Sequence, residues 1–328
     1  LCRCTGYEAI RRAARALCEA LATVDPRPEV RVDVLIGAGV LPSAFRAIPG
    51  LLAELPPPPP SPAGDDAVLV AGGTDLFVQK PEQLVDANLS FLSRRRDLAY
   101  VRRDGDELRV GGAVPIEEFR CSNVVREHFP SFESDLLLHS SMILRNRATL
   151  AGNVVNASPI GDMTIILLAL DARLVLVSQS GGRREVPLAR FFHGYKKVDL
   201  ACGELVGEIV IPLLPDGARF HFEKVSNRVT LDIAAVNSAM RLTLAAGGTI
   251  ADLRISAGGV APVPLLLDGL GRFVGRGLDD ATIAGIAEAA SSAAHPIDDV
   301  RGSATYKRLL LRQLVLAHFA ALSGRGEP

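Results

Sequence analysis

Residues 148–162 read Ala-Thr-Leu-Ala-Gly-Asn-Val-Val-Asn-Ala-Ser-Pro-Ile-Gly-Asp, and an apolar run at 165–170 follows almost directly. The small side chains would let a planar ring or a sugar approach the backbone closely, and the Asn and Ser side chains can hydrogen-bond polar groups. Asp162 can accept hydrogen bonds from the hydroxyl groups of such a ligand. It can equally cap the helix that the apolar run predicts, so the residues alone leave a binding loop and a helix cap both open.

A second stretch of this kind lies nearer the N-terminus, where a short apolar strand predicted over residues 67–71 ends in two glycines. Consecutive backbone N–H groups in such a turn form a concavity that binds anions, and the lack of a Cβ lets a pyrophosphate come close. A plain turn is the alternative. The residues of this expected site are Leu69, Val70, Ala71, Gly72, Gly73, Thr74, Asp75 and Leu76.

The pattern of apolar residues around these two stretches predicts an α+β chain. Helical spacing predicts an amphipathic helix over 7–24, and the proline-rich composition of 26–66 predicts an extended, exposed linker. Further predicted elements are strands at 67–71 and 108–110, helices at 131–144 and 162–170, a hairpin of 173–177 with 184–186, strands at 233–244 and 250–258, and helices at 279–294 and 303–322.

Composition excludes several classes of protein. Lys and Arg number 36 against 37 Asp and Glu, a formal charge of -1, so nothing favours a nucleic-acid backbone or an anionic membrane as partner. The longest apolar runs are far shorter than the roughly 20 residues of a membrane span. Dinucleotide and phosphate motifs of the G-x-G-x-x-G and P-loop types are missing, as is the G-x-S-x-G of serine hydrolases. The common nucleotide-binding folds and the serine hydrolases are therefore disfavoured, and no catalytic residue is assigned.

The five cysteines are an odd number scattered along the chain, which argues against a secreted disulfide framework and fits a reducing cytoplasm. Cys2 and Cys4 lie within one turn of each other, just before the helix predicted at 7–24. Two thiolates so placed suit one edge of a 2Fe-2S cluster, which needs four ligands. Cys18, Cys121 and Cys202 stand singly, so a chance pair is the alternative.

Taken together, these stretches resemble the molybdenum hydroxylases of the xanthine dehydrogenase type. The order of an iron-sulfur segment, a flavin domain and a small C-terminal domain is similar to the small subunit of bacterial two-subunit xanthine dehydrogenases, with its N-terminal part missing. The matching motifs are Cys-Arg-Cys-Thr-Gly-Tyr at 2–7, Ala-Gly-Gly-Thr-Asp-Leu at 71–76, the stretch 148–162, and shorter segments at 191–196, 203–206, 209–212, 224–226, 232–234 and 303–310.

The resemblance implies an FAD-binding domain of the vanillyl-alcohol-oxidase type at 67–215 and a small α+β C-terminal domain at 216–328. It implies a helical remnant of a 2Fe-2S domain at 1–25 and a linker at 26–66. It also implies transfer of electrons from 2Fe-2S clusters, held in part by Cys2 and Cys4, through FAD to NAD. The partners implied are a molybdenum-cofactor large subunit and the missing iron-sulfur segment.

The same resemblance assigns the FAD site residue by residue. The diphosphate would lie on the turn at 69–76, and the ribityl and flavin side would lie near Asp162. His139 stands where the family usually has an aromatic ring against the flavin, and Val229 to Leu231 replace residues that are usually charged. The remaining residues of the implied site are Thr149, Leu150, Ala151, Gly152, Asn153, Val206 and Lys224.

Three alternatives stay open. Lys224 can be a solvated lysine on a strand rather than a group beside the flavin. The whole protein can be a self-contained flavin oxidase of the same fold, which would not need Cys2 and Cys4. It can also be a structural adaptor that has lost the flavin, for which the unusual His139 is an argument.

Overall fold

The structure, a computed structural model, describes residues 7–22, 31–56, 67–178 and 180–322. Cys2 and Cys4, the predicted cluster ligands, lie outside the described residues. The chain divides into two compact units, residues 1–60 and 61–328. Within the described ranges no helix combines the length and the apolar character that crossing a membrane requires.

The first unit consists of short helices. Helix α1 (Tyr7–Leu21) matches the amphipathic helix predicted from the sequence, and it is followed by α2 (Arg31–Gly37), η1 (Ser43–Arg46) and α3 (Ile48–Ala53). The extended geometry predicted for this linker is therefore wrong over these helices. A proline in the first turn of α3 is compatible with helix formation, since that turn leaves N–H groups unbonded anyway. None of the described side chains of 31–56 is buried.

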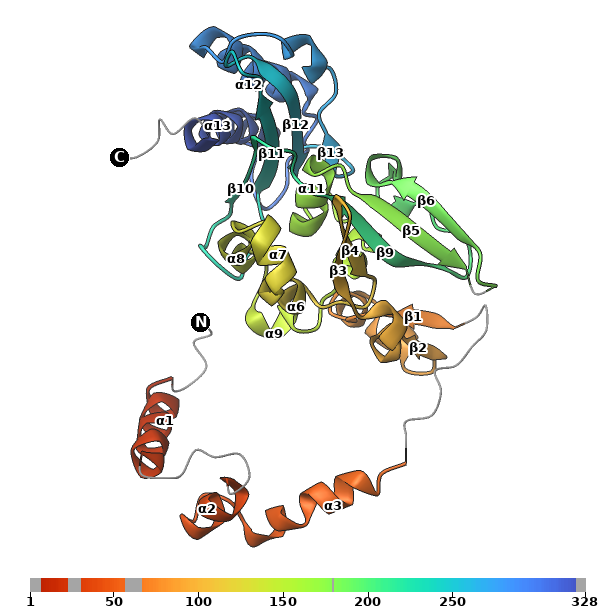
Figure 1. The fold of residues 1–328 in the computed structure, drawn as a ribbon, viewed down its shortest axis with the longest axis vertical. Coiled ribbons are helices and arrows are strands. Elements are labelled where there is room, and N and C mark those ends of the chain that lie inside the picture. Colours follow the sequence, from red (N-terminus) through yellow and green to blue (C-terminus); the bar gives the residue numbers. More distant parts are fainter. Residues whose placement is uncertain (1–6, 23–30, 57–66, 179, 323–328) are drawn as a thin grey trace. The chain divides into compact units, whose positions relative to one another are not determined.

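The second unit is built on two antiparallel sheets, which Figure 1 shows at either side of helix α11. The larger has the strand order β3-β4-β9-β5-β6 and the other the order β10-β11-β12-β13, while β1 with β2 and β7 with β8 form two small pairs. The strands are β1 (Val68–Val70), β2 (Leu89–Phe91), β3 (Val101–Asp104), β4 (Glu107–Gly111), β5 (Arg173–Ser178), β6 (Arg183–Pro187), β7 (Phe192–Gly194), β8 (Lys197–Val198), β9 (Glu204–Pro212), β10 (Ala218–Val225), β11 (Val236–Leu244), β12 (Ile250–Gly258) and β13 (Leu265–Leu266).

Helices of the second unit lie mostly at the ends and faces of these sheets. They are α4 (Leu76–Gln79), α5 (Pro81–Leu84), η2 (Leu92–Arg94), η3 (Arg96–Leu98), α6 (Ile116–Cys121), α7 (Asn123–His128), α8 (Phe132–Asp135), η4 (Leu136–Leu138), α9 (Met142–Arg145), α10 (Leu150–Val155), α11 (Asp162–Ala169), η5 (Leu188–Arg190), η6 (Leu270–Phe273), α12 (Asp280–Ala293) and α13 (Ala304–Leu322). The predicted strands at 67–71, 108–110 and 250–258, the hairpin and the two C-terminal helices are thus confirmed within a few residues.

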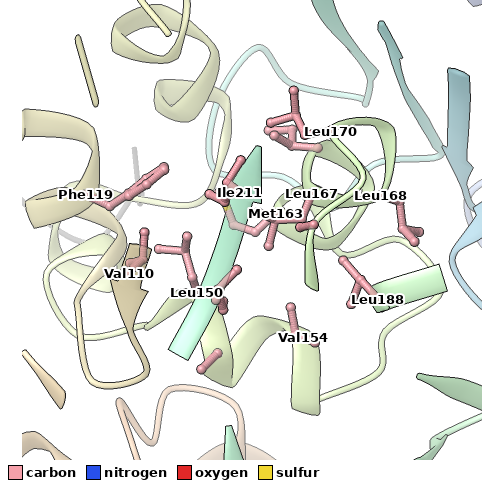
Figure 2. Close-up of a cluster of buried hydrophobic side chains, with 14 of the residues drawn as sticks. Val110, Phe119, Leu150, Val154, Met163, Leu167, Leu168, Leu170, Leu188 and Ile211 are labelled. Carbon is pink, nitrogen blue, oxygen red and sulfur yellow. The ribbon is translucent and has the colours of Figure 1, made fainter. Parts of the chain in front are cut away.

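Helix α11 lies in the interior of the second unit, and all of its residues are buried. A helix with no polar face has to be covered on every side. On one side α11 contacts β11 and β12, and on the other its apolar side chains belong to the core of the larger sheet. Figure 2 shows this core, with Met163 and Leu167 of α11 near Val110 and Ile211. A second core lies between the smaller sheet and helices α12 and α13.

The helix predicted over 131–144 is broken. Helix α8 and the turn η4 end at Leu138, and α9 begins only at Met142. Between them Ser140 has a φ of +47°, a left-handed conformation that is uncommon for a residue other than glycine. A right-handed helix cannot continue through a residue in this conformation. The break places His139 in a turn and not on a helix face, with its Nδ1 3.3 Å from Asp162 Oδ2.

Candidate functional site

The glycine turn after β1 has the geometry of an anion-binding concavity. Gly73 is in the left-handed region with a φ of +71°. The N–H groups of Gly72, Gly73, Thr74 and Asp75 donate to no backbone carbonyl among the described residues, and the turn is only half-buried. Successive unpaired N–H groups around one left-handed residue are the arrangement that receives a phosphate group. The residues therefore fit a pyrophosphate ligand.

The turn lies directly against the second predicted stretch. A Cβ placed on Gly72 would come within 2.0 Å of the Arg147 carbonyl oxygen and 2.9 Å of the Ala148 Cα. On Gly152 a Cβ would lie 4.0 Å from that of Ala71. The structure thus brings together two segments that the sequence separates by about 75 residues, because Gly72 allows the two backbones to touch.

The stretch from Thr149 to Asn153, which the sequence presented as a loop, is the start of helix α10. The Thr149 hydroxyl oxygen accepts a hydrogen bond from the Gly152 N–H at 2.9 Å and caps this helix. The Leu150 and Ala151 side chains are buried in the core, whereas Gly152 and Asn153 are half-buried. Asn153 Oδ1 accepts from the backbone N–H and the hydroxyl of Thr164, each at 3.3 Å, which ties α10 to α11.

Asp162, the first residue of α11, is the centre of a buried polar cluster. Its Oδ2 accepts from Lys224 Nζ at 2.7 Å and lies 3.3 Å from His139 Nδ1, and its Oδ1 accepts from Asn237 Nδ2 at 2.6 Å. Lys224 on β10 and Asn237 on β11 are cross-strand partners, so the sheet register presents both nitrogens to one carboxylate. The side chain of Asp162 is thus used for this cluster and not for a hydrogen bond that caps α11.

The side chains of this cluster are buried, and their burial and mutual contacts determine the pKa of Asp162. Side chains of Lys224 and Asp162 are only 4% and 7% exposed, so the alternative of a solvated lysine is wrong. Burial by itself would raise the pKa of Asp162, but the His139 hydrogen bond and the Lys224 charge together hold that pKa below its ordinary value. Asp162 is therefore ionised and acts only as an acceptor, which means that His139 Nδ1 carries the proton in their hydrogen bond.

The remaining residue of the implied site, Val206, has an apolar side chain and takes no part in the hydrogen bonds of this cluster. It is buried in β9, opposite Leu176 of β5, and belongs to the core of the larger sheet. Its part in a flavin site stays a prediction, as do the parts of the other assigned residues.

Residues that sequence reasoning missed complete the site. Asn237 is one of them, and the available signal was a polar side chain near the start of a strand predicted to be largely apolar. Arg145 and Glu117 are the others, a buried ion pair with Arg145 Nε at 2.6 Å from Glu117 Oε2. No local pattern marks this pair, because its members are 28 positions apart.

Comparison with known proteins gives the following matches. The sequence profile described as "FAD binding domain in molybdopterin dehydrogenase" matches residues 51–214, and that described as "CO dehydrogenase flavoprotein C-terminal domain" matches 221–322. The glyceraldehyde dehydrogenase medium chain of Sulfolobus acidocaldarius is 30% identical over 262 residues, 78% of this chain and 90% of that one. The carbon monoxide dehydrogenase medium chain of Hydrogenophaga pseudoflava is 30% identical over 259 residues, 77% of this chain and 88% of that one.

Among solved structures, that of carbon monoxide dehydrogenase from Hydrogenophaga pseudoflava lacking the Mo-pyranopterin moiety of its molybdenum cofactor is similar with a TM-score of 0.74. The similarity extends over 85% of this chain and 94% of that chain at 28% sequence identity. The α+β fold expected from the sequence, an FAD-binding domain followed by a small C-terminal domain, is confirmed by these matches.

Proposed function

The chain belongs to the molybdenum hydroxylase family as an FAD-binding medium subunit, and we propose that it passes electrons from 2Fe-2S clusters through FAD to NAD. The observation that carries the proposal is the glycine turn, with four N–H groups unpaired among the described residues, held against the capped start of α10. The domain limits expected from the sequence, 67–215 and 216–328, are part of the same proposal.

The residues of this chain would hold FAD at two places. The N–H groups of Gly72 to Asp75 would receive the diphosphate, and the backbone around Gly152 would close the other side of that concavity. His139 and Lys224 would lie on the flavin side, oriented by Asp162. When bound, FAD would supply the redox chemistry, receiving electrons from iron-sulfur clusters and donating them to the acceptor.

What the protein contributes is position and charge. Asp162 fixes the ammonium group of Lys224, and that fixed positive charge would favour negative charge developing near it. It also keeps the His139 imidazole in one orientation, with Nδ1 as donor. No side chain is required to give or take a proton from the substrate, because substrate oxidation would take place on another subunit.

The partners we propose are a molybdenum-cofactor large subunit and an iron-sulfur segment to which Cys2 and Cys4 contribute. Support comes from the order of motifs along the chain, which resembles the small subunit of bacterial xanthine dehydrogenases. A purine is accordingly the substrate class proposed for the large subunit. The acceptor is tested separately, since the loop after β10 carries an 86% exposed Val229 where the resemblance implies a charged residue.

The test is anaerobic mixing of the purified chain, loaded with FAD, with NADH or with xanthine, followed by flavin absorbance. We expect NADH to bleach the flavin, because hydride transfer between NAD and flavin is reversible when the two rings are held together. Xanthine alone should leave the flavin oxidised. Bleaching by xanthine would refute the electron-transfer role and favour a self-contained oxidase, and no reaction with NADH would refute NAD as acceptor.

A further inference from the structure

The turn that carries His139 is held from two sides by buried cations. Lys224 Nζ donates to the Leu138 carbonyl oxygen at 2.9 Å. Arg145 Nη1 donates to the next two carbonyl oxygens, those of His139 at 3.0 Å and Ser140 at 3.2 Å. Three successive carbonyls therefore accept from positively charged groups, and the left-handed Ser140 lies within this segment.

Each cation has its own carboxylate. Lys224 is paired with Asp162, and Arg145 is paired with Glu117 of α6 at 2.6 Å. Arg120 also binds Glu117, with its Nη2 at 2.6 Å from Oε1. The hydrogen bond from Arg120, working against burial and together with Arg145, lowers the pKa of Glu117 to about 2, so this carboxylate is ionised wherever the protein is folded at ordinary pH.

We infer that Arg145 is a positioning residue of the flavin site, which keeps the His139 imidazole on the Asp162 carboxylate by fixing the turn 138–140. This inference rests on the proposed function for its link to FAD. Only the guanidinium group fits the position, because it has to reach Glu117 with Nε and two carbonyls with Nη1. A lysine would keep the charge without this planar, divergent set of donors.

Arg145→Lys is the test, and Arg120→Lys is its matched control. Arg120 shares the Glu117 carboxylate, but its backbone contact is the Glu133 carbonyl oxygen and not the turn of His139. The first readout is the NMR signal of the Nδ1 proton of His139, which the hydrogen bond to Asp162 protects from exchange; His139→Phe identifies the signal by removing it. The second readout is FAD affinity by titration.

We expect Arg145→Lys to lose the protected Nδ1 signal and to bind FAD about tenfold more weakly, the effect of losing one charge-assisted hydrogen bond at the site. Arg120→Lys should keep the signal and nearly all of the affinity. If Arg145→Lys does not fold, Glu117→Gln removes the anchor of Arg145 and should weaken the same signal.

Either of two results would overturn the inference: an Arg145→Lys protein that keeps both the signal and the affinity, or an Arg120→Lys protein that loses as much of each. The two proposals are separable. A wild-type protein that binds no FAD refutes the proposed function, whereas the His139 signal is measured without flavin and still decides whether Arg145 positions the turn.

Discussion

Replacing Asp162 by Asn should destabilise the protein far more than the loss of an ordinary ion pair. The substitution keeps the shape of the side chain but removes the negative charge beside the ammonium group of Lys224, which is 4% exposed and also donates to the neutral Leu138 carbonyl oxygen. Breaking a buried pair by removing one member costs about 3–5 kcal/mol, because the other charge stays buried without compensation. The hydrogen bond that Asn237 donates at 2.6 Å is weakened as well.

The double variant Asp162→Asn with Lys224→Met separates charge burial from packing. Removing both charges leaves no uncompensated ion, so its cost should fall at least about 2 kcal/mol short of the sum of the two single costs. The assay is urea unfolding, read as the shift in midpoint at unchanged slope. A matched control is Asp97→Asn, which breaks the Arg95–Asp97 pair, also 2.6 Å long but 48% and 60% exposed, and should cost no more than about 1 kcal/mol.

Additive single and double effects would refute this reasoning, since they would mean that Lys224 and Asp162 do not depend on each other. The pH dependence gives a second check. The pKa of Asp162 is lowered in the folded protein, so its contribution is present above the unfolded pKa of about 3.9 and is lost as the pH falls through the lower folded pKa. The Asp162→Asn protein should lack this acid-dependent loss.

Two further substitutions test other parts of the structure. Gly72→Ala should weaken FAD binding and lower the melting temperature, because the new Cβ would overlap the Arg147 carbonyl oxygen and push the two segments of the site apart. The control is Gly271→Ala, whose Cβ would meet no atom within 4 Å and which should change neither property. Equal effects of the two substitutions would contradict the contact between Gly72 and Arg147. Asp135→Asn should stabilise the protein at pH 8 by on the order of 2 kcal/mol and leave its stability unchanged near pH 3. Burial raises the pKa of Asp135 to about 6, so the stability of the wild type falls as the pH rises from the unfolded pKa through that value. Urea unfolding at both pH values measures this, and an effect that does not depend on pH would contradict it.

Local sequence singled out the candidate residues that belong to short motifs, while leaving a plain turn and a helix cap open as alternatives. The glycine turn stands out because two residues without a Cβ follow a strand, and Asp162 because it ends a run of small and polar residues; the resemblance added Lys224. Several of the strands and most of the long helices followed from apolar periodicity, as for β12 and α13. These features depend on residues that are close together in the chain, so they can be predicted from a single sequence.

What failed depends on contacts between distant residues. Residues 131–144 have the apolar spacing of one helix, yet Arg145 and Lys224 bind the carbonyls of the turn that breaks it. The start of α10 looked like a loop because Gly152 and Asn153 have little helical preference, although the Thr149 side chain caps a helix there. Gly72 contacts the backbone of Arg147, which is far away in the sequence, and no pattern of residue spacing predicts that these two segments are adjacent.

The most direct test of the central claim, that the glycine turn binds the diphosphate of FAD, is to titrate the wild-type chain and its Gly73→Val variant with FAD and with riboflavin, which lacks the diphosphate. A branched side chain at a φ of +71° would strain the turn by about 1–3 kcal/mol and place its Cβ 2.6 Å from the Phe77 ring. We predict that the wild type binds one FAD per chain, and that Gly73→Val binds FAD at least about tenfold more weakly while its riboflavin affinity is unchanged. Equal affinity of both proteins for FAD, or no binding of FAD by the wild type, would contradict the account.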